Sequence, residues 1–126
     1  MLAADALLVV VPYYNKPSQR GILAHFEQVA QAVDKPIVVY NIPGRCGTAI
    51  EPETLASLHH RCPNVIGVKQ SFSDLDTFSR IRSLLPNSFR LWSGDDALTL
   101  PMLALGAEGV VSVASHLCGP TLRQMI

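Results

Sequence analysis

Five short runs of apolar, mostly β-branched residues recur along the chain and alternate with longer segments of helical periodicity. The runs are 6–11, 36–40, 64–69, 89–93 and 108–113. Continuous apolar runs of this length are typical of strands buried on both faces, as in parallel sheets. Strands that alternate with helices select a parallel sheet with right-handed crossovers, so the sequence predicts an α/β fold.

The segments between these runs have the spacing of amphipathic helices. In residues 18–33, Ile22 and Phe26 recur on one face at helical spacing. Pro52 followed by Glu53 is a typical start for a second helix. The chain is therefore expected to place a helix at each crossover of the sheet.

Residues with capping chemistry mark where three later helices should begin. Ser73, three residues before an acidic residue, has a capping-box pattern. Asp95 or Asp96 is expected to cap the next helix, because a short carboxylate accepts hydrogen bonds from the free N–H groups at a helix start. Gly119 and Pro120 are expected to open the last helix.

Two architectures fit this alternation, the doubly wound sheet and the (β/α)8 TIM barrel. No Gly-x-Gly-x-x-Gly motif follows a strand, whereas polar residues stand at the C-terminal ends of the predicted strands, where such barrels carry their active sites. A complete barrel has eight strands and about 250 residues. The 126 residues are therefore expected to form one partial TIM-barrel domain, 1–126, with about five βα units from the later part of a longer barrel. Such a piece would expose two sheet edges and an apolar sheet face.

Composition argues against several classes of partner. Ten basic and ten acidic residues are scattered and cancel, so no charged surface is expected to bind nucleic acid or an anionic membrane. No apolar run approaches the roughly 20 residues that span a bilayer, and the first residues lack the basic region of a signal peptide. We therefore expect a soluble, cytoplasmic protein that binds small molecules.

The cysteines and histidines indicate neither a disulfide framework nor a metal site. Cys46, Cys62 and Cys118 are odd in number and far apart, as expected for free thiols in a reducing compartment. His59 and His60 lie close to Cys62, but their spacing matches no zinc pattern. No metal ligand is therefore expected.

Lys69 ends an apolar predicted strand, which is an unfavourable place for an ammonium group. In a poorly solvated site this group must be paired or lose its proton, and a neutral amine is a nucleophile toward carbonyl carbon. Side chains alternate along a strand, so Lys69, Gly67 and Val65 are expected to share a face, near Tyr40 on the preceding strand. The alternatives are a lysine that extends to solvent or one that pairs with an acid.

Five separated motifs carry a resemblance to a known family. They are PYYNKP at 12–17, YNIPGR at 40–45, GVK at 67–69, SGDD at 93–96 and GVVSV at 109–113. In this order, and over nearly the whole chain, they resemble the dihydrodipicolinate synthase and N-acetylneuraminate lyase family. The resemblance implies a lyase that needs neither metal nor organic cofactor.

The resemblance also implies roles for individual residues. Lys69 would form a Schiff base with pyruvate, and Tyr40 would relay protons near the imine. Tyr14 resembles a family tyrosine that reaches into the neighbouring subunit's site, which implies a homo-oligomer, a dimer or a tetramer, in the full-length form.

Three further residues are implied to bind substrate. Arg45 resembles the arginine of the synthase branch, which meets the carboxylate of aspartate semialdehyde. Gly94 would expose its backbone to substrate, and Val111 would form a wall of the lysine pocket. These residues imply condensation of pyruvate with L-aspartate semialdehyde in lysine and diaminopimelate biosynthesis.

Two alternatives to the synthase interpretation stay open at this point. One is a sibling class I pyruvate aldolase, such as N-acetylneuraminate lyase or a 2-keto-3-deoxy sugar acid aldolase. The other is a truncated, non-catalytic chain that acts by pairing with another subunit. By the resemblance, the family's Gly-Thr-Thr loop would lie before Met1, so this chain alone is expected to be inactive or nearly so.

Overall fold

The computed structural model describes residues 4–126 as a parallel α/β structure built on a single five-stranded sheet. The strands are β1 (Leu7–Val10), β2 (Ile37–Asn41), β3 (Val65–Gln70), β4 (Arg90–Ser93) and β5 (Gly109–Val110). They lie in chain order, and every neighbouring pair is parallel. A doubly wound sheet reverses its strand order at a switch point. The unbroken order confirms the prediction of a partial (β/α)8 barrel.

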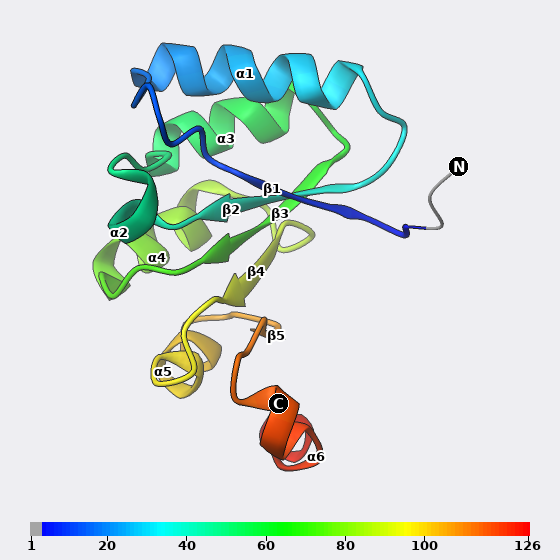
Figure 1. The fold of residues 1–126 in the computed structure, drawn as a ribbon, viewed down its shortest axis with the longest axis vertical. Helices are drawn as coiled ribbons and strands as arrows, with labels where there is room; N and C mark the ends of the chain where they lie inside the picture. The colour runs from blue at the N-terminus through cyan, green and yellow to red at the C-terminus, as the bar shows by residue number, and fades with distance from the viewer. Residues whose placement is uncertain (1–3) are drawn as a thin grey trace.

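The helices follow the strands along the chain, and α1, α3 and α4 lie over one face of the sheet, whereas α6 lies apart from it beyond β5 (Figure 1). They are α1 (Gln19–Gln31), α2 (Pro43–Cys46), α3 (Pro52–Arg61), α4 (Leu75–Leu84), α5 (Thr99–Ala104) and α6 (Ser115–Met125). α1 packs against α3, and α3 packs against α4, so these three helices form a continuous layer. The one-turn helix α2 was not expected from the sequence. No helix within residues 4–126 has the length and apolar character needed to cross a membrane.

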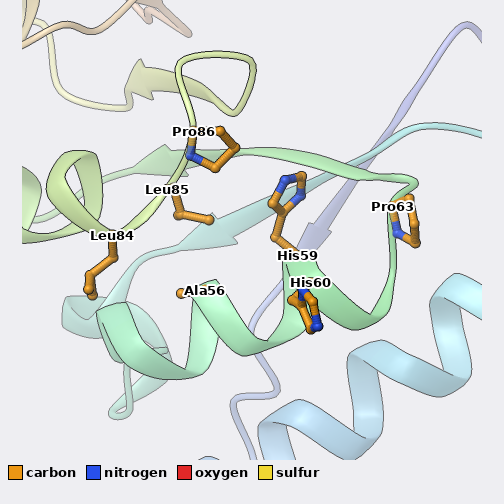
Figure 2. A pocket seen from close by; sticks show the side chains of 7 residues that line it. All are labelled: Ala56, His59, His60, Pro63, Leu84, Leu85 and Pro86. Atoms are coloured by element: carbon orange, nitrogen blue, oxygen red, sulfur yellow. The ribbon is translucent and has the colours of Figure 1, made fainter.

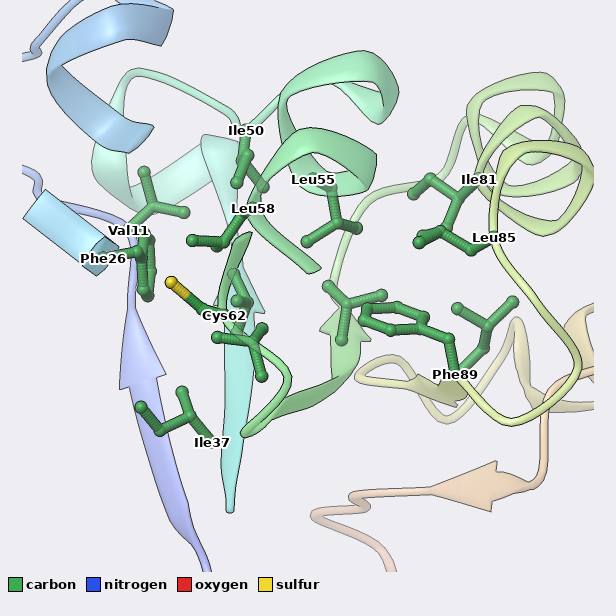
Figure 3. Packing of buried hydrophobic residues seen from close by; sticks show 14 of the residues in the cluster. Val11, Phe26, Ile37, Ile50, Leu55, Leu58, Cys62, Ile81, Leu85 and Phe89 are labelled. Carbon is green, nitrogen blue, oxygen red and sulfur yellow. The ribbon is translucent and has the colours of Figure 1, made fainter. Parts of the chain in front are cut away.

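The hydrophobic core lies between the helices and one face of the sheet. Along β2, Ile37 and Val39 are fully buried on the helix side, whereas Val38 and Tyr40 on the other side are half-buried. Figure 3 shows the apolar side chains of α3 and of the strands converging in this layer. Full burial of a side chain such as Leu58 contributes about 1.5–3 kcal/mol, which is why the helix-side face is nearly all apolar.

The opposite face of the sheet is open. Leu8 is 50% exposed and Val111 is 44% exposed, and they border a shallow apolar hollow of about 250 Å³. In the part of the chain that the structure describes, β1 and β5 have strand neighbours on one side only. The expected open edges and exposed apolar face are therefore present.

Val65 does not share the face of Lys69, contrary to the expectation from simple alternation. The register between β2 and β3 shifts after the first pair: Ile37 faces Val65, but Val38 faces Gly67. The extra residue is a β-bulge, which moves the following side chains to the opposite face. Val65 consequently lies in the helix-side core, while Gly67 and Lys69 keep the open face.

The capping residues also differ from those expected. α4 is capped by Asp74 rather than Ser73: the Asp74 carboxylate accepts from the N–H groups of Asp76 and Thr77 at 3.0 and 3.3 Å. The carboxylate also accepts from the Thr77 hydroxyl at 2.7 Å. Asp74 therefore satisfies two N–H groups of the first turn by itself, and no capping box forms.

Neither Asp95 nor Asp96 caps α5, which begins at Thr99 without a side-chain cap. The chain first makes a turn, in which the Asp95 carboxylate accepts from the N–H of Ala97 at 2.9 Å. Asp96 accepts from the N–H of Ala114 at 3.0 Å and so holds the start of α6 instead.

The last two elements are shorter or more broken than their sequence patterns suggest. β5 covers two residues of the expected 108–113, because the chain turns away from β4 after Val111 donates to the Ser93 carbonyl at 2.8 Å. α6 is interrupted by non-helical backbone at Cys118, so the predicted opening at Gly119 and Pro120 corresponds to its second part.

The Asp74 cap makes part of the stability of the fold dependent on pH. Hydrogen bonds from the Thr77 side chain and backbone hold the pKa of the Asp74 carboxyl below its ordinary value of 3.8. A lowered folded-state pKa stabilises the protein above the ordinary pKa, and this contribution is lost as the pH falls through the lower value. We expect Asp74→Ala to lower the urea midpoint at neutral pH, and the difference from the unmodified chain to become smaller in acid, as the Asp74 carboxylate is protonated below its lowered pKa.

Ser73→Ala is the matched control, since Ser73 lies next to Asp74 and makes no cap. Its urea midpoint should equal that of the unmodified chain both at neutral pH and in acid. A larger loss for Ser73→Ala than for Asp74→Ala would contradict the assigned cap.

Candidate active site

Lys69 and Tyr40 lie side by side on the open face, at the C-terminal ends of β3 and β2. The two residues are register partners, and Lys69 Nζ lies 3.9 Å from the centre of the Tyr40 ring. A cation or amine over an aromatic face is attracted by the ring's quadrupole. The structure therefore brings together the two residues that the sequence singled out.

Lys69 neither extends into solvent nor pairs with an acidic side chain, the two alternatives considered from the sequence. It is only 9% exposed, so its side chain does not extend into solvent. No ion pair joins it to a carboxylate anywhere in residues 4–126. An almost buried, acid-free amine at a strand end is well placed to meet an electrophile that enters from the open face.

Trp92 completes the surroundings of Lys69 from the other side and was not anticipated as a site residue. It is the register partner of Lys69 on β4 and also lines the apolar hollow. Gly67 makes room for its ring, because a Cβ at this position would stand 2.6 Å from Trp92 Cζ3 and overlap the Arg90 carbonyl oxygen. The space beneath Lys69 is therefore filled by an aromatic side chain, and only glycine allows it.

Gly94 directly follows β4 and borders the lysine closely. Its N–H donates to the Gln70 carbonyl at 2.8 Å. A Cβ on Gly94 would overlap Ser71 Oγ and lie 2.9 Å from Lys69 Cε. The absence of a side chain at Gly94 is therefore a condition for the observed position of Lys69.

The other three residues named from the sequence each follow the C-terminal end of a strand. Arg45 is exposed in α2, immediately after β2 and at the same end of the sheet. Val111 borders the hollow beside Trp92. Tyr14 is 94% exposed in the connection from β1 to α1. No hydrogen bond or ring contact within residues 4–126 joins Arg45 or Tyr14 to Lys69.

The histidines next to Cys62 belong to a different place in the fold. His59 and His60 line a hollow of about 410 Å³ between α3 and the connection from α4 to β4, and Figure 2 shows its lining side chains. His59 Nδ1 lies 2.8 Å from the Val65 carbonyl oxygen, and its ring packs edge-on against Phe89. His59 therefore serves the packing of the fold, at the end of β3 opposite Lys69. No group of three or more His, Cys, Asp or Glu residues within 4–126 could hold a metal ion.

The fold and the site define a class, the parallel barrels that present a lysine at a strand end on the barrel-interior face. The model of the dihydrodipicolinate synthetase family matches residues 2–126, and the chain belongs to this family. It is 55% identical over 122 residues to the 4-hydroxy-tetrahydrodipicolinate synthase of Listeria welshimeri, a match that covers 97% of this chain and 41% of that protein.

Solved structures give the same result. The dihydrodipicolinate synthase of Aquifex aeolicus superposes with a TM-score of 0.97 at 49% identity, over 98% of this chain and 42% of that one. The DHDPS of Cyanidioschyzon merolae, solved with lysine bound, has a TM-score of 0.95 at 52% identity, with the same coverage of 98% and 42%. The chain thus spans about two-fifths of the length of the relatives that it matches.

The close contact at Gly94 leads to a test with a matched control. Gly94→Ala should displace Ser71 and Lys69 and destabilise the chain by about 1–3 kcal/mol, because an added methyl must be accommodated by backbone and side-chain shifts. Gly44→Ala should leave stability nearly unchanged, since nothing lies within 4 Å of a Cβ built there. Urea unfolding of both variants measures the difference, and equal losses would refute the role assigned to Gly94.

Proposed function

We propose that the chain carries the Schiff-base centre of a class I pyruvate lyase, with Lys69 as the covalent catalyst. The observation that supports this most directly is the position of Lys69 at a strand end: it is almost buried, has no acidic partner within residues 4–126, and lies 3.9 Å from the Tyr40 ring. A lysine kept from solvent is the usual nucleophile for forming an imine with a ketone. Neither metal nor organic cofactor takes part in this proposal.

In the proposed reaction, Lys69 Nζ attacks the keto carbon of pyruvate, and loss of water gives an iminium ion. Removal of a proton from the methyl group then yields an enamine, whose carbon adds to the aldehyde of the second substrate. Tyr40 is the register partner of Lys69, and its ring lies beside Lys69 Nζ, which suits its hydroxyl to relay protons near the imine. Attack of the second substrate's amino group on the imine carbon then closes the ring and expels the Lys69 amine.

We propose L-aspartate semialdehyde as the aldehyde, and hence the 4-hydroxy-tetrahydrodipicolinate synthase reaction of lysine and diaminopimelate biosynthesis. Support comes from the relative of that name at 55% identity. It also comes from Arg45, whose guanidinium stands exposed at the site's end of the sheet and suits a planar carboxylate. These two observations favour the synthase over a sibling aldolase.

We further propose that the complete reaction, beyond imine formation on Lys69, needs the rest of a family barrel. Residues 1–126 would form one partial barrel domain whose open face packs against the remaining strands, and Tyr14, 94% exposed, would enter the site of a second subunit in a homo-oligomer. The free cysteines fit a cytoplasmic setting. In this proposal Gly94 and Val111 border the bound substrate.

Reductive trapping tests the covalent step on the chain as it stands. After incubation with pyruvate and borohydride, peptide mapping should place the adduct on Lys69, because its amine is the one shielded from solvent and from acids. The chain has two other lysines, Lys16 and Lys35, both exposed, which act as internal controls. Equal labelling of all three lysines, or no label on Lys69 in a chain shown to be folded, would refute the proposal.

The complete condensation reaction needs a separate test from that of imine formation. We expect the 126-residue chain, supplied with pyruvate and aspartate semialdehyde, to show no measurable condensation, because five strands cannot enclose the substrates. A coupled assay for the cyclic product measures this. Steady turnover by the purified chain would show that the five-strand arc is sufficient. A folded chain with neither adduct nor turnover would instead favour a non-catalytic role in subunit pairing.

A further inference from the structure

A buried pair of amide side chains lies directly behind Lys69 and Tyr40. Asn41 and Gln70 end β2 and β3, are register partners, and are 1% and 0% exposed on the helix side of the sheet. Asn41 Nδ2 donates to Gln70 Oε1 at 3.0 Å. Each amide is thus the chain neighbour of a site residue and points to the opposite face of the sheet.

The Asn41–Gln70 hydrogen bond favours one pairing register of β2 and β3, whereas the apolar side chains of these strands do not. β2 and β3 carry similar apolar residues along most of their length, and their pairing already contains a bulge between Ile37 and Val38. Apolar side chains pack in several registers, whereas a buried amide without a partner is strongly unfavourable. The register that joins Asn41 to Gln70 is also the one that places Lys69 beside Tyr40.

Stability alone does not account for a glutamine at this position. Gln70 Nε2 is buried and has no hydrogen-bond partner within residues 4–126. An orphaned buried donor opposes folding, and an apolar side chain of similar size would avoid it. The presence of glutamine is therefore better explained by the hydrogen bond that Gln70 Oε1 accepts from Asn41, which fixes Asn41 against β3.

Asn41 also connects the strand end to the segment that carries Arg45. Its Oδ1 accepts from the N–H of Ile50 at 3.2 Å, and its Nδ2 lies 3.4 Å from the Ile50 carbonyl oxygen. These bonds close the segment 41–50, which contains α2 and Arg45, back onto β2. The Asn41 side chain thus contacts Gln70, the residue next to Lys69, and also Ile50, which closes the segment that carries Arg45.

We propose that Asn41 is a positioning residue: through Gln70 and Ile50 it sets Lys69 against Tyr40 and fixes the turn that carries Arg45. The proposal rests on the proposed function for its catalytic meaning, but the positioning itself is a structural claim about β2 and β3. It therefore can be tested without any turnover.

The test is the nuclear Overhauser effect between the Tyr40 ring protons and the Lys69 side chain. In the isotope-labelled chain this cross-peak should be strong, given the 3.9 Å between Nζ and the ring centre. Asn41→Ala should reduce its intensity to less than half. Gln70→Met should reduce it likewise while changing the urea midpoint little, because methionine removes the orphaned Gln70 donor but leaves Asn41 Nδ2 one hydrogen bond short. A purely structural role would instead move stability and leave the cross-peak intact.

Asn64→Ala is the matched control. Asn64 is half-buried at the opposite end of β3, where its Nδ2 donates to the carbonyls of Ala30 and Val33 at 3.0 and 3.2 Å. This variant should lose stability and keep the Tyr40–Lys69 cross-peak. An undiminished cross-peak in Gln70→Met, or an equal loss in Asn64→Ala, would overturn the proposal. If Asn41→Ala does not fold, Gln70→Met decides the question.

Trapping with pyruvate and borohydride adds a chemical measurement on the same variants. Asn41→Ala should form the Lys69 adduct about 10- to 100-fold more slowly, the loss expected from a small misplacement of reacting groups, whereas Asn64→Ala should keep the rate. An unchanged adduct rate in a folded Asn41→Ala chain would count against positioning. If the unmodified chain gives no adduct but the cross-peaks behave as stated, the Schiff-base function fails and the positioning role stands.

Discussion

The alternation of side chains across the parallel sheet is the constraint on which the rest of this structure depends. Successive residues of a strand face opposite sides, so each strand must serve the helix layer with one set of residues and the open face with the other. On β2 this places Ile37 and Val39 in the core and leaves Tyr40 on the open face. The same strands thus build both the core and the site, and the site residues are those that alternate with the core residues along each strand.

Two glycines on the open face leave room for the large side chains around Lys69. Gly67 admits the ring of Trp92, and Gly94 admits Ser71 and the stem of Lys69. Both glycines are needed for close approach rather than for an unusual backbone, since neither has a positive φ. Lysine, tyrosine and tryptophan can therefore crowd together at the strand ends while the apolar hollow beside them remains open to incoming groups.

The buried polar side chains on the helix side affect the strand register. Asn41 and Gln70 are buried where apolar residues would pack with fewer unmet hydrogen bonds. Their bond selects one strand register out of several that apolar packing would permit. The stability of the core and the geometry of the site are in this way assigned to different residues of the same two strands.

Most of the architecture could be predicted from the chain because periodicity is a local property. Five apolar runs, the helical spacing of Ile22 and Phe26, and the strand-end position of Lys69 are all readable within a few residues. Prediction was wrong where a neighbouring element decided the outcome: the bulge that moved Val65, and the Asp96 carboxylate that holds Ala114 rather than α5. Trp92 was overlooked because nothing in a four-residue strand tells which residue it will face.

The sequence by itself therefore determined the parallel α/β class and the presence of a strand-end lysine, since each follows from the local pattern of apolar and polar residues. Only the tertiary structure decided which face each residue takes, how closely Lys69 meets Tyr40, and that Asn41 pairs with Gln70. The physical reason is that register and close packing depend on contacts between segments about 30 residues apart in the chain, and no local pattern encodes those distances.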